Sequence, residues 1–244
     1  MKFPAILVPA LIGSIVLHAA EVPKALSYLP ANEFVKGATT VVVPPAELDK
    51  YVAMVEEAAR KDPDWFEEHQ KKAPPGVPLP FDPKLGLTKE QYDEYLELWG
   101  KREFKAVDAV ILQLKEGSDK KWAITVVMPN SDGSSPISTL KYDPEADAFV
   151  SPNGTLKRLE DVNADKNSIL GEWSGHEWKF EEETPLGKTK ENFAIGKTGD
   201  GKFGLLVYRM QEVSSEGTRL FDKSLVIRFP LGEAGILKVP APKR

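Results

Sequence analysis

The sequence predicts an α+β protein in which N-terminal helices pack on a predominantly antiparallel β-sheet or barrel-like meander. Before Phe104, apolar residues recur at steps of three and four, which is the spacing of one face of a helix. From Phe104 onward, apolar and polar residues alternate, and short polar turn sequences separate the alternating runs. Strands so closely spaced indicate hairpins, because parallel strands need long crossover connections.

The chain of 244 residues divides into four sections by these patterns. Residues 1–20 resemble a secretory signal peptide, since Lys2 precedes a largely apolar run that ends at the small residues Ala19 and Ala20. We therefore expect export to the periplasm or the extracellular space, with cleavage after Ala19 or Ala20. The alternatives are an uncleaved membrane anchor and a buried N-terminal strand. No second apolar run approaches the roughly 20 residues of a membrane helix, so no membrane span is expected after cleavage.

Residues 21–103 form the helical and proline-rich section. A β-branched run over residues 37–45 predicts a short strand that ends at its two prolines. Residues 46–61 carry one apolar stripe and predict an amphipathic helix. Asp is a preferred N-cap residue and Pro is preferred at the first helical position, so Asp62 and Pro63 predict the start of a second, short helix.

The rest of this section contains a proline-rich segment and a third helix. Five prolines in residues 73–86 exclude both a helix and a central strand, so this segment is expected to be extended. Thr88 and Gln91 have the spacing of a capping box, which predicts a helix that runs to about Gly100.

Residues 104–236 form the antiparallel section, with roughly eight to ten strands expected from the spacing of the turns, and residues 237–244 form a loose tail. The sequence Gly199-Asp200-Gly201 is typical of a hairpin turn. Gly171 and Trp173 resemble the Gly-x-Trp element with which lipocalin-like barrels begin a strand. That resemblance covers three residues and implies a strand start, without a ligand.

Composition excludes several classes of function. The net charge of −5 leaves no excess of positive charge for nucleic acid, so no nucleic-acid partner is expected. The absence of cysteine excludes disulfides, thiolate nucleophiles and Cys-ligated zinc. The few histidines are far apart and no metal or nucleotide motif has the required spacing, so neither a metal nor another cofactor is expected.

Three residues are the candidates for catalysis. His176 and Glu177 lie in the segment "GEWSGHEWKF", where alternation places His176 with Trp178 and turns Glu177 to the opposite face. We expect His176 to be packed among aromatic residues. Asp108 interrupts an apolar strand, where burial would raise its pKa or require a partner. The alternative for Asp108 is a solvated edge position or a cross-strand ion pair.

Aromatic residues in the N-terminal section are the candidates for ligand binding. Trp65, Tyr92, Tyr95 and Trp99 either pack the helices or line a groove for a small molecule, glycan or protein partner. The expected function is that of an exported, non-catalytic domain that binds a ligand or partner or has a structural role in the envelope. The alternative is an exported hydrolase that uses carboxylate acid–base chemistry.

Overall fold

The alternating runs form strands, and the capped segments form helices. The computed structural model describes residues 21–73, 77–128, 137–159, 161–215 and 219–237, so the predicted signal peptide lies outside the described residues. The helices are α1 (Asp49–Lys61), α2 (Pro63–Gln70) and α3 (Lys89–Gly100). The strands are β1 (Phe34–Val43), β2 (Glu103–Glu116), β3 (Trp122–Val127), β4 (Ile137–Asp143), β5 (Ala148–Val150), β6 (Thr155–Arg158), β7 (Val162–Ala164), β8 (Trp173–Thr184), β9 (Gly187–Thr198), β10 (Phe203–Ser214) and β11 (Arg219–Pro230).

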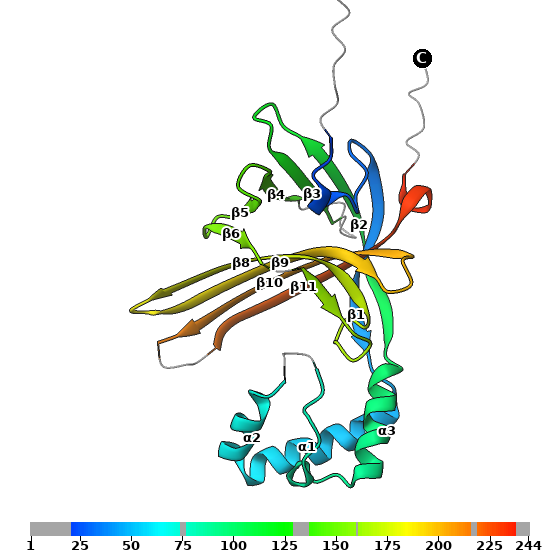
Figure 1. Ribbon diagram of the computed structural model, residues 1–244, viewed down its shortest axis with the longest axis vertical. Coiled ribbons are helices and arrows are strands. Elements are labelled where there is room, and N and C mark those ends of the chain that lie inside the picture. Colours follow the sequence, from blue (N-terminus) through cyan, green and yellow to red (C-terminus); the bar gives the residue numbers. More distant parts are fainter. Residues whose placement is uncertain (1–20, 74–76, 129–136, 160, 216–218, 238–244) are drawn as a thin grey trace, which may run out of the picture.

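The strands of the described chain form one antiparallel sheet that closes into a barrel (Figure 1). The order is β6-β5-β4-β3-β2-β1-β11-β10-β9-β8, and pairing of Arg158 with Trp178 and of Lys157 with Lys179 joins β6 to β8. The short strand β7 pairs with the first residues of β8, outside this ring. The predicted antiparallel, barrel-like meander is therefore confirmed, but the described chain is mostly β with three short helices, so the predicted α+β class is only partly correct.

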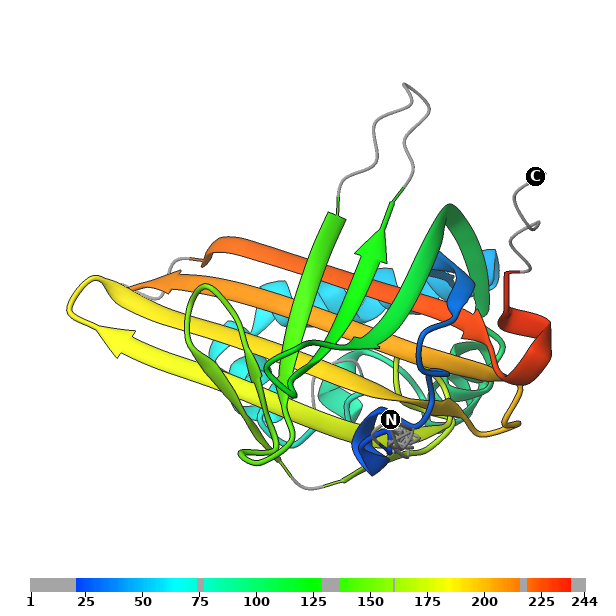
Figure 2. The ribbon, with the colours of Figure 1, turned by 90° about the horizontal axis from the view of Figure 1, so that it is seen from above.

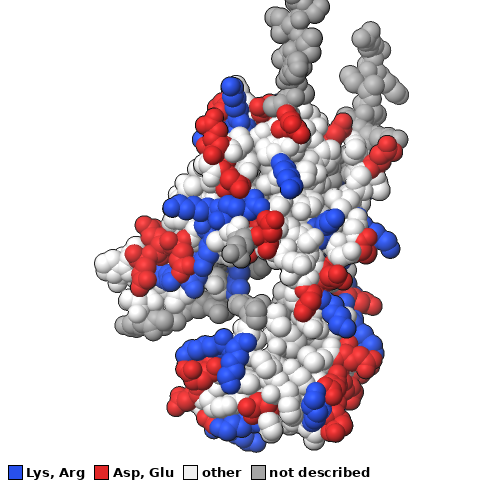
Figure 3. Space-filling model, in the orientation of Figure 1, with Lys and Arg blue, Asp and Glu red and all other residues white. Residues whose placement is uncertain are grey.

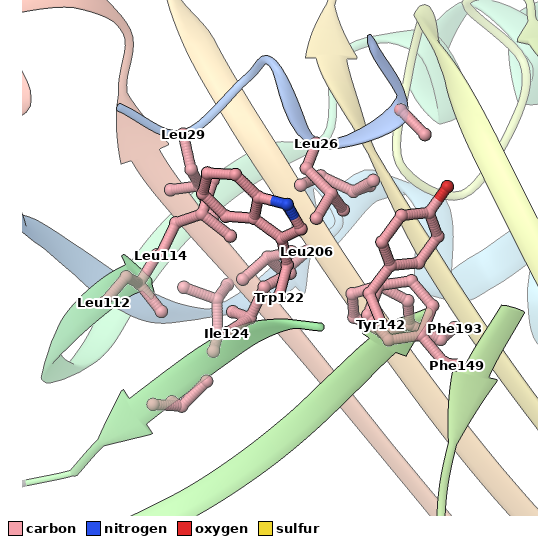
Figure 4. Close-up of a cluster of buried hydrophobic side chains, with 14 of the residues drawn as sticks. Leu26, Leu29, Leu112, Leu114, Trp122, Ile124, Tyr142, Phe149, Phe193 and Leu206 are labelled. Atoms are coloured by element: carbon pink, nitrogen blue, oxygen red, sulfur yellow. The ribbon is translucent and has the colours of Figure 1, made fainter. Parts of the chain in front are cut away.

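The barrel is filled by side chains from its inner face. Trp178, Phe149 and Phe193 are fully buried, and their rings contact one another at centroid distances of 4.5 to 5.9 Å. Residues 21–31 close one mouth, with Leu26 and Leu29 inserted beside the barrel residues, as Figure 4 shows. The N-terminal section thus supplies both a strand and a plug to the barrel.

The three helices pack chiefly on one another, so the prediction that they pack on the sheet is only partly correct. Their core contains Tyr51, Leu85, Leu87 and Tyr92. Asp62 accepts a hydrogen bond from the Trp65 backbone amide at the start of α2, and the predicted capping box is present at the start of α3. Helices α2 and α3 therefore begin at the residues that their caps predict, whereas α1 begins at Asp49, after a 3-10 turn at Ala46–Leu48, without a side-chain cap. None of the helices in the described part of the chain has the length and apolar character needed to cross a membrane.

The sheet β8–β11 extends beyond the closed part of the barrel. Strands β8 and β9 pair along twelve positions, whereas β6 reaches β8 only at Trp178 and Lys179. Figure 2 shows these long strands from above, with β11 at one side. On the face shown in Figure 3, acidic and basic residues are intermixed, and a gap opens between the helices and the sheet at the left of the view, while the surface is continuous at the right.

Candidate functional site

Asp108 lies at an irregularity of β2 and not inside the core. The register between β1 and β2 shifts between Ala38 and Thr40, and Asp108 is exposed there. Its backbone amide donates to Thr39 Oγ1 at 3.0 Å, and the Thr39 hydroxyl is 3.4 Å from its carboxylate. This is the solvated alternative, and the group bonded to Asp108 is a hydroxyl and not a second acid.

Glu177 and His176 point to opposite faces of β8, as alternation predicts. Glu177 accepts a hydrogen bond from the Asn192 side-chain amide at 2.8 Å on the outer face. The His176 ring lies 6.3 Å from the Trp178 ring and 5.9 Å from the Tyr28 ring. These two candidates therefore do not act on the same side of the sheet.

His176 also belongs to a polar cluster that sequence analysis missed. Its Nδ1 atom is 2.8 Å from Asp161 Oδ1 and 2.5 Å from Arg158 Nη2. The ring nitrogen can donate to Asp161 or accept from Arg158, but not both at once. The cluster borders a pocket of about 530 Å³ at the barrel mouth, beside Glu21 and Lys24 of the plug.

Asp147 anchors the other side of this cluster. It accepts hydrogen bonds from the Tyr142 hydroxyl at 2.7 Å and from Arg158 Nη1 at 3.3 Å, and its backbone carbonyl accepts from Trp178 Nε1 at 3.0 Å. Burial, followed by the hydrogen bond to Asp147, raises the pKa of the Tyr142 phenol. Because these charged groups bind one another, the cluster chiefly holds strands β4, β6 and β8 together. In the sequence, "DPEAD" at residues 143–147 indicates a turn at Asp147 but no partner for it.

The pH dependence of stability tests this cluster at Asp161. The hydrogen bond with His176, followed by that with Arg158, lowers the pKa of the Asp161 carboxyl. A lowered folded-state pKa stabilises the fold above the unfolded value of about 3.9, and that stabilisation is lost as the pH falls through the folded value. Asp161→Asn is therefore expected to lower the urea midpoint at pH 7, with a difference from wild type that shrinks below about pH 4.

Asp165→Asn is the matched control, because its carboxylate accepts a backbone amide instead of pairing with Arg158 and His176. A deficit of Asp161→Asn that is the same at pH 7 and at pH 3 would contradict the ion-pair interpretation.

The four aromatic candidates form the packing of the helices. Tyr92 is buried and donates its hydroxyl to the Leu79 carbonyl, and Tyr95 lies between the Tyr92 and Trp99 rings, 6.0 Å from each. Trp65 stacks on the His69 ring at 4.8 Å. These contacts favour the packing alternative over a ligand groove.

Trp99 has a second contact that ties the helices to the barrel. Its Nε1 donates to the Asn167 carbonyl at 2.8 Å, and Arg102 stacks on its ring and donates to the Ser168 carbonyl at 2.6 Å. The end of α3 is thereby bound to the loop that precedes β8. These contacts favour a packing role for Trp99 between α3 and the barrel.

The strongest candidate site is a pocket of about 500 Å³ on the outer wall of the barrel, which we name the outer-wall pocket. It lies across β2, β1, β11 and β10 and is lined by Lys36, Gly37, Ala38, Thr40, Phe104, Ala106, Ala109, Phe203, Arg228 and Pro230. The small residues form a shallow floor, and the lining is apolar apart from Lys36, Thr40 and Arg228. An apolar hollow with few polar groups is the usual form of a small-molecule site.

Arg228 is the charged group of this pocket. Its guanidinium carbon is 4.6 Å from the centre of the Phe104 ring and 4.5 Å from that of Phe203. Ring contacts use the faces of a guanidinium, whereas its five N–H donors lie in the plane. Within the described residues no acceptor binds these donors, and Nε is buried without a partner. Burial lowers the pKa of Arg228, which Asp200 partly opposes.

Alternation in the sequence places Arg228 on the polar face of its strand, opposite Ile227 and Phe229, and no local pattern there indicates a binding site. Phe104 and Phe203 are about a hundred residues apart, so no local pattern brings them to Arg228. The described residues contain no group of three His, Asp or Glu side chains that could hold a metal ion. No family model, curated protein or solved structure matches this chain.

Proposed function

We propose that this protein is an exported, non-catalytic binding protein whose ligand is an apolar molecule with a carboxylate group. The observation that carries the proposal is Arg228, a half-buried guanidinium with no hydrogen-bond acceptor among the described residues. Removing N–H donors of a guanidinium from water without hydrogen-bond acceptors is unfavourable, and a ligand anion would relieve that cost. A carboxylate matches the planar fork of donors and can form two parallel hydrogen bonds.

The pocket around Arg228 supplies the apolar part of the ligand site. Phe104 and Phe203 restrict access to the edge of the guanidinium, and Ala106 and Ala109 leave space over the neighbouring strand. An aliphatic or aromatic body next to the carboxylate fits this lining, whereas a bare inorganic anion leaves the lining exposed to water. The barrel interior supports the same assignment, because side chains fill it.

Binding of octanoate tests the proposal, with octanol as the neutral ligand of similar length. We expect isothermal titration or NMR shifts to show octanoate bound more tightly than octanol by the wild-type chain. Arg228→Gln should weaken octanoate binding about 10- to 100-fold, because a charge-assisted hydrogen bond contributes about 1.5–3 kcal/mol. Arg228→Lys should recover part of it, since lysine keeps the charge but not the fork.

Arg60→Gln, an exposed arginine of α1, is the control and should bind octanoate as the wild type does. Equal affinity for octanol and octanoate, or no effect of Arg228→Gln in a variant with an unchanged melting temperature, would refute the proposal.

The alternative is an exported hydrolase, and the contact between His176 and Asp161 is the observation that favours it. We rank it second for two reasons. First, Asp108, His176 and Glu177 do not converge on one site of the barrel. Second, the pKa of Asp161 is lowered, so its carboxylate is ionised at neutral pH and is a poor general acid and a weak general base. A purely structural role in the envelope would give the unpaired N–H donors of Arg228 no ligand to bind, and it therefore does not account for them.

A further inference from the structure

Strand β11 has an unpaired edge. On one side of β11, strand β10 pairs with it along the length of the strand. On the other side, β1 pairs with β11 only at Ile227 and Arg228. Among the described residues, no strand pairs with the other side of residues 220–226, and β11 is the outermost strand there in Figure 2. Such an edge presents free backbone N–H and C=O groups to solvent.

This edge is open to solvent and contains no proline. Leu220 is 65% exposed and Phe221 is 41% exposed, and Lys223 is also exposed. Natural proteins usually shorten or cover such edges, because they pair with other chains. An edge of seven residues is long enough to bind an extended peptide as an added strand.

The free edge ends beside the outer-wall pocket. Arg228 follows Val226 by two positions, which is about 7 Å along a strand. Strand β1 has no further pair with β11 after Thr39, at the position where its register with β2 shifts. A peptide strand on the edge therefore reaches the Arg228 guanidinium at one end.

We infer that the edge of β11 binds an extended peptide whose C-terminal carboxylate is held by Arg228 in the outer-wall pocket. This rests on the proposed function and names the class of its partner. The peptide runs parallel to β11, since its C-terminus lies at the Arg228 end. Its last side chain lies over Ala106 and Ala109, where a small apolar residue fits. Lys223 on the edge favours an acidic residue earlier in the peptide.

Hydrogen exchange of the full chain tests the inference with a library of hexapeptides whose last three residues are random. The library is used once with free C-termini and once amidated. We expect the acid library at millimolar concentration to slow exchange of backbone amides 220–226 at least tenfold, and the amidated library to slow it much less. In Arg228→Gln, the two libraries should slow the exchange of amides 220–226 to the same extent. In the control Arg60→Gln, the difference between the two libraries should be that of the wild type.

The outcomes separate the two proposals. If octanoate binding depends on Arg228 but the acid library leaves residues 220–226 unprotected, the peptide inference fails and the ligand site stands. If the amidated library protects the edge equally, the edge binds strands without Arg228, and the inference also fails. If neither octanoate nor the acid library responds to Arg228→Gln, both proposals fail.

Discussion

Trp178→Ala is expected to lower the free energy of unfolding by about 3–5 kcal/mol, the range for truncation of a large buried aromatic side chain. Trp178 has no exposed surface, and it packs edge-on against Phe149 at 4.8 Å and against Tyr142 at 6.0 Å. It also pairs with Arg158 at the point where β6 closes the barrel. The substitution therefore removes core volume and weakens the closure together.

Urea denaturation followed by circular dichroism measures this effect. Trp178→Phe keeps most of the ring and loses the hydrogen bond from Nε1 to the Asp147 carbonyl, so we expect a loss of about 1–2 kcal/mol. Ile137→Ala, at a strand residue that is 66% exposed, should change stability by about 0.5 kcal/mol or less. Equal losses for Trp178→Ala and Ile137→Ala would show that the barrel does not depend on this ring.

Glu191→Ala is expected to cost about 3 kcal/mol or more, because three donors converge on a carboxylate that is 1% exposed. Ser151 Oγ and Asn153 Nδ2 donate to one oxygen at 2.8 and 3.1 Å, and the Tyr208 hydroxyl donates to the other at 3.0 Å. The carboxylate thereby fixes the β5–β6 turn on the inner face of β9. Its removal leaves all three donors without this acceptor.

Glu191→Gln separates charge from volume. The glutamine amide keeps one acceptor oxygen, but its NH2 group replaces the other oxygen and faces a hydrogen-bond donor. We therefore expect the free energy of unfolding to fall by about 1–3 kcal/mol. Burial, followed by the charge of Glu191, raises the pKa of Tyr208, so ultraviolet titration should show that pKa lowered in Glu191→Gln. Glu182→Gln, an exposed carboxyl on β8, is the control and should change neither quantity. An unchanged Tyr208 titration in Glu191→Gln would contradict the assigned contact.

Some elements were fixed by residues that are neighbours in the sequence. The alternation in β3 and β11, the capping box of Thr88 and Gln91, and the turn at Gly199 each depend on local geometry. The strand start at Trp173 also occurs as predicted, after Gly171 at a φ of 72°. The hydrophobic period and the backbone preferences of residues act over a few positions, so the elements that depend on them can be predicted from the sequence.

The candidate site could not be predicted in this way. Asp108 and His176 attracted attention because each is unusual in its segment, yet Asp108 is solvated and His176 is held by Asp161 and Arg158. The Trp65 and Tyr92 rings contact His69 and Phe81, and these contacts favour packing over a ligand groove. Local sequence gives the type of a side chain but not its neighbours.

The sequence by itself determined the helices, most strands and the antiparallel class, because these follow from periodicity and caps. Only the tertiary structure decided that β6 meets β8, that Leu26 and Leu29 plug the barrel, and that the helices pack mainly on one another. It also placed Arg228 between Phe104 and Phe203. The physical reason is that closure and convergence depend on the register and tilt of strands distant in sequence, which no local pattern specifies.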